Sequence, residues 1–216
     1  MRSLHGFDLG RPERLAAVLV TVGLLSGCAG MDVESGDADN RYIEGDGVAT
    51  EYSPDEREEA PDIEGETLDG DQLSMSELGG DDVVVVNFWA SWCAPCRAEK
   101  PVLQEVREEN AENGVTFLGV NIKDDRNAAQ SFESNFEVPY PSLYDQPGEI
   151  PQTLRDTVPP QAVPSTLVID REGRIAGRII GASDYRTLSE LLESILDGED
   201  GSNTAAGSAF ARGGGQ

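Results

Sequence analysis

Cys93 and Cys96 are two of the chain's three cysteines, and they stand three positions apart around Ala94 and Pro95. Two thiols at this spacing can form a permanent structural disulfide, supply half of a metal site, or exchange electrons with another disulfide. A bridge that closes so short a loop restricts the unfolded chain little, so it would add little stability. Two thiolates alone do not complete the four-coordinate shell that zinc prefers. Electron exchange is therefore the chemistry that this pair favours.

Histidine, the usual partner of a catalytic nucleophile, occurs only once, at His5. His5 lies in an N-terminal segment that we expect to be cleaved, so the mature protein would have no imidazole. This excludes the usual Cys-His and Ser-His-Asp catalysis and argues against copper and zinc sites that need histidine. We predict no metal ion and no organic cofactor, because a redox-active disulfide between Cys93 and Cys96 itself carries two electrons.

A helix that begins at Cys93 would explain how the pair works. A thiol at a helix N-terminus meets the positive end of the dipole and unpaired N–H groups, which favour the thiolate. We predict that Cys93 attacks a substrate disulfide and that Cys96, one turn deeper, resolves the mixed disulfide. Pro95 fits the first turn, where its missing N–H costs nothing. Together with Ala94, it supports the active-site backbone.

The segments around the pair alternate between strand and helix patterns. Residues 81–90 form a continuous apolar run, "DDVVVVNFWA", which is typical of a strand buried on both faces. The order βαβαβ followed by ββα predicts an α/β sandwich. The expected strands lie at 81–90, 114–122, 141–145, 165–170 and 174–181, and the expected helices at 93–113, 126–136 and 183–196.

The start of the chain is typical of an export signal. Arg2, Arg11 and Arg14 form a basic leader. Residues 15–25, which follow, form an uncharged apolar run of the length of a signal-peptide core. The following "LSGC", ending at Cys28, resembles the lipobox of bacterial lipoproteins, in which the cysteine is lipidated and becomes the new N-terminus. We predict a lipoprotein signal peptide at 1–27 and a lipid anchor on Cys28. The alternative is a simple secretory signal with a chance cysteine.

Composition divides the mature chain into three parts. Residues 28–59 are rich in Asp, Glu and Gly, and we predict an acidic flexible tether there. Residues 60–196 are long enough for one domain with a core, and 197–216 form a Gly/Ser/Ala-rich segment that we predict to be a disordered tail. The net charge of −25 makes nucleic acid and anionic lipid poor partners. This acidity reflects either a high-salt habitat or a merely solvated surface.

Two motifs resemble the thioredoxin superfamily: "WCAPC" at 92–96 after a buried strand, and "AVPSTLVID" at 162–170 before a hairpin. The wider pattern WCxPCxxE, over residues 92–99, resembles the TlpA/ResA-type membrane-tethered thiol–disulfide oxidoreductases. The resemblance covers residues 60–196. It implies the α/β thioredoxin fold, a central mixed sheet flanked by helices, with a central insertion at 123–163 and an N-terminal β extension.

The resemblance also implies substrate-binding residues. The family's proline matching Pro164 is cis, and the residue before it, here Val163, offers its backbone to the substrate. We expect Trp92 to shield the disulfide and to present an apolar contact surface. Trp89 is expected in the core, and the loop with Tyr140 and Tyr144 could shape a substrate groove.

The resemblance assigns proton exchange to Glu99. Asn87 stands where plain thioredoxin has a buried Asp that carries protons, so that role must move. Glu99 lies three residues after Cys96, and its family counterpart is an acid near the active site. A partly buried carboxyl with a raised pKa could exchange a proton with Cys96. The alternative is that Glu99 is a first-turn acid that favours the helix dipole.

The resemblance implies a protein disulfide oxidoreductase on the outer face of the cytoplasmic membrane. Its expected reaction is reduction of disulfides in apocytochrome c before haem attachment, with electrons from a membrane thiol carrier of the CcdA type. A general extracytoplasmic disulfide reductase is the nearest alternative. A thiol peroxidase would need a Thr-and-Arg setting that "WASWCAPC" lacks. A non-enzymatic surface lipoprotein with an inert disulfide is the remaining alternative.

Overall fold

The computed structural model describes residues 45–159 and 161–210, with side chains as far as Gly198. Cys28, the predicted signal peptide and most of the predicted tether lie outside the described residues. Within the described part, none of the helices combines the length and the apolar character needed to span a membrane. The elements in chain order are β1 (Ala49–Glu51), β2 (Glu64–Glu66), β3 (Gln72–Ser74), α1 (Met75–Gly79), β4 (Val83–Trp89), α2 (Ala94–Asn110), β5 (Val115–Ile122), α3 (Arg126–Phe136), β6 (Ser142–Asp145), α4 (Ile150–Thr153), β7 (Ser165–Ile169), β8 (Ile175–Ile180) and α5 (Tyr185–Phe210).

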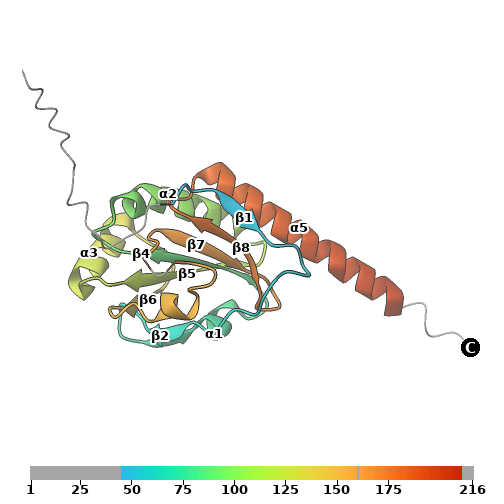
Figure 1. Cartoon of the computed structure of the whole chain (residues 1–216), viewed down its shortest axis with the longest axis horizontal. Helices are drawn as coiled ribbons and strands as arrows, with labels where there is room; N and C mark the ends of the chain where they lie inside the picture. Colours follow the sequence, from blue (N-terminus) through green and yellow to red (C-terminus); the bar gives the residue numbers. More distant parts are fainter. Residues whose placement is uncertain (1–44, 160, 211–216) are drawn as a thin grey trace, which may run out of the picture. The chain divides into compact units, whose positions relative to one another are not determined.

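A mixed six-stranded sheet in the order β1-β8-β7-β4-β5-β6 forms the centre of the domain (Figure 1). Strands β4, β5 and β6 are parallel, whereas β7 pairs antiparallel with both β4 and β8. Every residue of β4 is buried, as expected for an apolar run covered on both faces. The predicted thioredoxin fold, a mixed sheet with flanking helices, is confirmed. The predicted insertion at 123–163 contains α3, β6 and α4.

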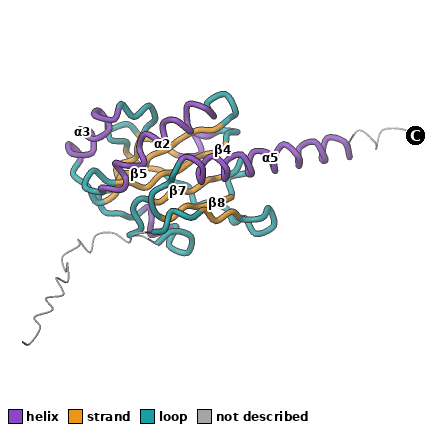
Figure 2. Tube along the Cα trace, turned by 90° about the horizontal axis from the view of Figure 1, so that it is seen from above, coloured by secondary structure: helices purple, strands orange, loops and turns teal. Residues whose placement is uncertain are grey.

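Two apolar clusters cover the two faces of the sheet. Val83 and Val85 of β4 belong to one cluster with residues of α2 and α5, and Figure 2 shows these helices lying over the strands. Val84 and Val86 belong to the other cluster, which includes residues of α1, α3 and the segment after α4. Successive side chains of a strand point to opposite faces. The valines of β4 therefore pack against the helices on both faces of the sheet.

The N-terminal β extension begins earlier than the sequence predicts. β1 pairs antiparallel with β8, and the Ile175 N–H donates to the Glu58 carbonyl at 2.8 Å. Residues 45–59, which we predicted as part of the flexible tether, are thus attached to the sheet. Their attachment needs few large apolar side chains, because backbone hydrogen bonds along a sheet edge supply much of the contact.

The C-terminal helix also differs from the prediction. α5 ends at Phe210, whereas we placed a disordered tail from residue 197. Extending a helix that already packs on the sheet adds one hydrogen bond per residue, which offsets the weak helix propensity of Gly and Ser.

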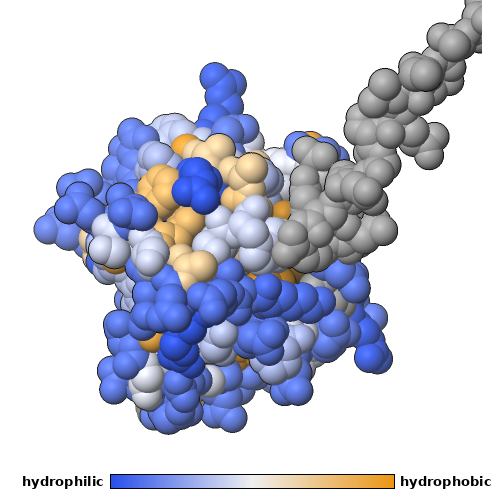
Figure 3. Space-filling model, turned by 90° about the vertical axis from the view of Figure 1, so that its left-hand side faces the viewer, coloured by the Kyte–Doolittle hydropathy of each residue, from blue (hydrophilic) through white to orange (hydrophobic). Residues whose placement is uncertain are grey.

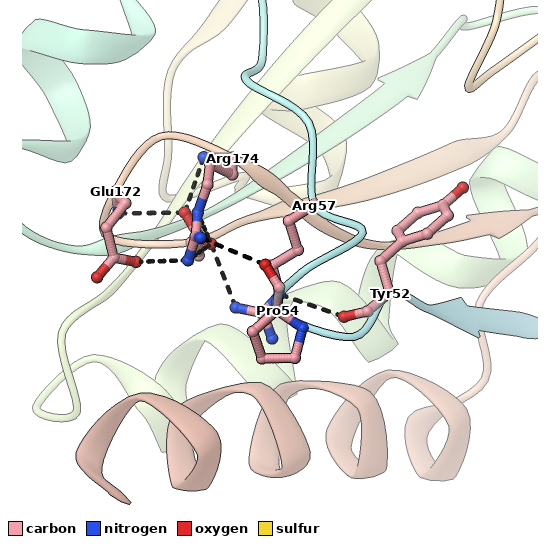
Figure 4. A network of polar contacts seen from close by, with 6 residues as sticks. Tyr52, Pro54, Arg57, Glu172 and Arg174 are labelled. Carbon is pink, nitrogen blue, oxygen red and sulfur yellow. Dashed lines mark hydrogen bonds and ion pairs between the residues drawn. The ribbon is translucent and has the colours of Figure 1, made fainter. Parts of the chain in front are cut away.

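Asp170 joins the N-terminal extension to the β7–β8 turn. Figure 4 shows Arg57 of the extension next to Glu172 and Arg174 of the turn. The fully buried carboxylate of Asp170 accepts from Arg57 Nη1 at 3.2 Å and from Arg174 Nε at 2.9 Å. The backbone N–H groups of Glu172 and Arg174 donate to its other oxygen at 3.1 and 2.7 Å. Arg57 in turn donates to the Tyr52 carbonyl at 3.2 Å. One carboxylate therefore holds two chain segments that are far apart in the sequence.

Replacing Asp170 by Ala is expected to lower the free energy of unfolding by about 3 kcal/mol or more, because it removes a buried anion from Arg57 and Arg174. Urea unfolding followed by circular dichroism measures this change. Glu172→Ala is the control: its side chain is 57% exposed and pairs with Arg174 at 3.2 Å, so we expect a loss below about 1 kcal/mol. Similar losses for the two variants would contradict the role given to Asp170.

Candidate active site

The two cysteines form a disulfide at the start of α2. Cys93 and Cys96 are joined by an S–S bond of 2.01 Å, with 5.3 Å between their Cα atoms. Cys93 is the N-cap residue, and its sulfur accepts the Cys96 backbone N–H at 3.1 Å. Pro95 lies in the first turn, as predicted. The Cys93 sulfur therefore faces the positive end of α2, which stabilises a thiolate there once the disulfide opens.

Both sulfur-bearing residues are buried in this disulfide form. Cys93 is 1% exposed and Cys96 is 0% exposed. In this oxidised state Cys93 belongs to the apolar cluster that also contains Val163. Trp92 and Pro95 are half-buried and Ala94 is exposed, so these residues border the disulfide at the surface.

The Val163–Pro164 peptide bond is cis, as the resemblance implies. β7 begins directly after Pro164, and its first residue, Ser165, pairs with Phe88 near the end of β4. The Pro164 carbonyl accepts the Gly181 N–H at 2.9 Å, which ties this turn to the end of β8. The cis-proline turn thus lies at the edge of the sheet where β4 leads to the disulfide.

Glu99 lies beyond the first turn of α2 and is buried, so the alternative of a first-turn acid does not hold. Glu99 Oε1 accepts from Asn87 Nδ2, and Oε2 accepts from the Ser183 N–H, both at 2.9 Å. Burial raises the pKa of Glu99 to about 7, although these bonds and the Lys100 charge lower it in part. Glu99 follows Cys96 by three residues on one helix. A carboxyl so placed can exchange a proton near neutral pH.

Asp124, which the sequence analysis did not single out, holds the loop before the disulfide. It accepts from the Ser91 N–H and hydroxyl at 2.5 and 2.8 Å, and from Asn121 Nδ2 at 2.9 Å. Trp92 Nε1 donates to the Lys123 carbonyl at 3.0 Å. The segment after β5 thus positions the segment after β4. The sequence contains one signal for this role of Asp124: "KDD" at 123–125 directly follows the strand β5. Because β5 is parallel to β4, both strands end on the same side of the sheet, and the residues after them lie close together.

The other aromatic predictions have mixed outcomes. Trp89 lies in the core, as expected, and its Nε1 donates to Ser142 Oγ at 3.2 Å. Tyr140 is buried, and its hydroxyl accepts a hydrogen bond from Lys100 Nζ. It therefore belongs to an interior network rather than presenting its ring to a substrate. Tyr144 is half-buried and donates to the Asp124 carbonyl at 3.0 Å, beside the active-site loop.

The class of protein follows from three features. The protein has a disulfide at a helix N-terminus, a cis-proline turn at the end of the sheet where β4 leads to this disulfide, and a mixed sheet. Together they define a thiol–disulfide oxidoreductase of the thioredoxin superfamily. Comparisons with known proteins agree. The Redoxin family model matches residues 55–195, and the chain belongs to this family.

Named relatives place the chain among ResA-type proteins. It is 36% identical to the thiol:disulfide interchange protein HelX of Rhodobacter capsulatus, over 65% of this chain and 76% of HelX. It is 26% identical to the thiol–disulfide oxidoreductase ResA of Bacillus cereus, over 86% of this chain and 98% of ResA. Among solved structures, a secreted thiol–disulfide isomerase of Corynebacterium glutamicum is 32% identical, with a TM-score of 0.65, over 73% of this chain and 97% of that one.

Replacing Asp124 by Ala is expected to slow disulfide exchange by about tenfold or more, because the loop before the disulfide loses both hydrogen bonds from Ser91, and Asn121 of β5 loses a third. Stopped-flow tryptophan fluorescence during reduction by dithiothreitol measures the rate. Asp125→Ala is the matched control, since Asp125 caps α3 by accepting the Ala128 N–H at 3.0 Å. Equal rates in the two variants would contradict a positioning role for Asp124.

Proposed function

We propose that this thiol–disulfide oxidoreductase is an extracytoplasmic reductase, anchored to the outer face of the cytoplasmic membrane through lipidated Cys28, and that it reduces disulfides in apocytochrome c before haem attachment. The observation that carries the reductase chemistry is the Cys93–Cys96 disulfide at the start of α2. It shares an apolar cluster with Val163 of the cis Val163–Pro164 bond, and buried Glu99 follows Cys96 by three residues on α2.

The proposed reaction moves two electrons from the protein's dithiol to the substrate's disulfide. The Cys93 thiolate attacks one substrate sulfur, the substrate S–S bond breaks, and the other substrate sulfur leaves as a thiolate and takes a proton from water. Glu99 then accepts the Cys96 proton. The Cys96 thiolate attacks Cys93 Sγ, which restores the Cys93–Cys96 disulfide and releases the second substrate sulfur as a thiolate that takes a proton from water. A membrane thiol carrier of the CcdA type is the proposed donor that reduces this disulfide again.

A protein substrate suits the surface around the disulfide. Trp92 and Pro95 are half-buried and Ala94 is exposed. Figure 3 shows apolar surface among hydrophilic residues on the side of the domain where α3 lies, and β5 leads directly to this helix. Trp92 and Pro95 keep apolar surface accessible next to the disulfide in the sequence, which favours contact with an unfolded polypeptide. We propose that the Val163 backbone holds the substrate strand and that Trp92 contacts its side chains.

The proposed location draws support from the relatives and from the start of the chain. The Corynebacterium glutamicum relative is described as secreted. The "LSGC" motif ending at Cys28 supports a lipid anchor on this chain. Expression of the full chain and of Cys28→Ala in a bacterial host, followed by membrane fractionation, tests the anchor. Membrane retention of the Cys28→Ala protein would contradict it.

Substrate preference is tested with two disulfide substrates at equal concentration. The reduced protein is mixed with an oxidised C-x-x-C-H peptide, the haem-attachment motif, or with insulin. We expect the peptide to react about tenfold faster, and Cys93→Ser to reduce neither. Equal rates would overturn the apocytochrome substrate and leave a general reductase. Peroxide consumption without reduction of either substrate would overturn the reductase assignment itself.

A further inference from the structure

The side chain of Lys100 is entirely buried, with an exposed fraction of 0%. It follows Glu99 on α2 and lies one residue outside the WCxPCxxE motif. Moving an ammonium out of water costs several kcal/mol unless nearby groups compensate. A lysine at this place therefore needs partners that favour its charge.

The ammonium of Lys100 has polar and aromatic partners from β4 and from the loop before β6. Its Nζ donates to Asn87 Oδ1 at 3.3 Å and to the Tyr140 hydroxyl at 3.1 Å. The same nitrogen lies 4.8 Å from the centre of the Trp89 ring and 5.3 Å from that of Tyr140. Aromatic ring faces attract cations. These contacts favour the charged form of the amine.

Asn87 connects this cation to the candidate proton-exchange residue. Its side-chain oxygen accepts from Lys100, while Nδ2 donates to Glu99 Oε1 at 2.9 Å and to Thr166 Oγ1 at 3.3 Å. One amide thus turns its oxygen to a cation and its nitrogen to a carboxyl, an orientation that favours both charges. An amide neither gains nor loses a proton near neutral pH. Asn87 therefore couples Lys100 and Glu99 electrostatically.

We propose that Lys100 is a positioning residue for the thiol–disulfide reaction: its buried cation stabilises the carboxylate form of Glu99 through Asn87. It thereby sets the pH range in which Glu99 exchanges a proton with Cys96. This role rests on the proposed function of the Cys93–Cys96 pair and identifies how the proton affinity of its buried acid is controlled.

The role is clearest when a donor dithiol reduces the protein. The donor thiolate attacks Cys93 Sγ, the Cys93–Cys96 bond breaks, and Cys96 leaves as a thiolate. Protonated Glu99 gives Cys96 its proton and becomes a carboxylate, which the Lys100 cation stabilises. The second donor thiolate then attacks the donor sulfur bound to Cys93. Cys93 is released as a thiolate, and two electrons have passed to the protein's sulfurs.

Other titratable groups surround this pair. The charge of Glu133 on α3 raises the pKa of Lys100. The charges of Glu99 and Glu133 raise the pKa of Tyr140, and the charge of Arg107 lowers it. Burial raises the pKa of Glu99 to about 7 and lowers that of Lys100 to about 8, and each charge partly offsets the burial of the other. Burial also raises the pKa values of Glu133 and Tyr140, which favours their neutral forms. Removing the Lys100 cation should therefore leave Glu99 protonated to higher pH.

The test is a carbon-13 NMR titration of the Glu99 carboxyl in the oxidised protein, where no exchange reaction runs. We expect the wild-type inflection near pH 7. In Lys100→Met it should move up by about one unit or more, since an opposite charge lowers a carboxyl pKa by about 1–3 units. Lys100→Gln keeps a hydrogen-bond donor for Asn87 but lacks the charge, so the Glu99 inflection should also move up in this variant.

Arg171→Met is the control for the loss of one positive charge. β7 starts opposite Phe88 and ends opposite Val84, so Arg171 lies past the end of the strand remote from the disulfide. We expect no shift of the Glu99 inflection in this variant.

A second readout is the rate of reduction by dithiothreitol per donor thiolate. This rate should fall as the pH rises and Glu99 loses its proton. In Lys100→Gln the fall should occur at a higher pH, by the same amount as the shift in the titration.

An unchanged Glu99 inflection in Lys100→Gln would overturn the proposal, whether or not Lys100→Met folds. An equal shift in Arg171→Met would also overturn it, because the cause would then be net charge. Both of these outcomes are read from NMR titrations of the oxidised protein, so they do not depend on activity. Failure of the reduced wild-type protein to reduce any disulfide would instead overturn the proposed function.

Discussion

Replacing Cys93 by Ser is expected to slow insulin reduction by about 10³-fold or more, a loss typical of removing a catalytic nucleophile. Cys93 is the N-cap of α2, where the helix dipole and the Cys96 N–H stabilise a thiolate. A serine hydroxyl is neither ionised at neutral pH nor able to form a disulfide. The remaining Cys96 lies inside α2 rather than at its N-cap, so it lacks the position that stabilises a thiolate for the attack. Insulin turbidity in the presence of dithiothreitol measures the loss.

Cys96→Ser is the matched variant, and it should fail in a different way. Cys93 can still attack, but the mixed disulfide then has no resolving thiol, so a covalent adduct accumulates. Mass spectrometry without reductant detects this adduct. Its formation would also report that Cys93, buried in the disulfide form, becomes accessible after reduction. An adduct on Cys93→Ser and none on Cys96→Ser would reverse the two roles.

Local patterns predict the elements that carry the two sulfurs. The run of four valines from Val83 to Val86 predicts a strand covered on both faces, and β4 is such a strand. The proline at position 95 predicts a helix start, and α2 begins at Ala94. The cis form of the Val163–Pro164 bond came from the family resemblance, because a sequence pattern alone favours the trans form.

Contacts between distant parts of the chain could not be predicted in this way. Arg57 and Asp170 are 113 positions apart, and Ser91 and Asp124 are 33 apart, so neither pair leaves a local periodic signal. The prediction of a tether up to residue 59 failed for this reason. Lys100 is a further case: a lysine on a helix usually lies at the surface, and only the fold brings Asn87 and Tyr140 around it.

Replacing Glu99 by Gln should remove a pH dependence that the wild-type protein has. Burial raises the Glu99 pKa to about 7 in the oxidised protein, so the acid form is present below pH 7 and is lost as the pH rises through 7. Only this form can give Cys96 a proton when the disulfide opens. The rate of reduction by dithiothreitol, divided by the donor thiolate concentration, should therefore fall above pH 7 in the wild type.

In Glu99→Gln the same rate should be about 100-fold lower at pH 6 and nearly independent of pH, because general acid catalysis contributes about 10²–10⁴ and an amide cannot supply it. The two proteins should approach each other at pH 9, where the wild-type carboxyl has also lost its proton. Glu105→Gln removes an exposed charge from the same helix and should keep the wild-type profile. A fall near pH 7 that survives in Glu99→Gln would assign the proton to a group other than Glu99. Lys100, which adjoins Glu99 and whose pKa burial lowers to about 8, would be the next group to replace.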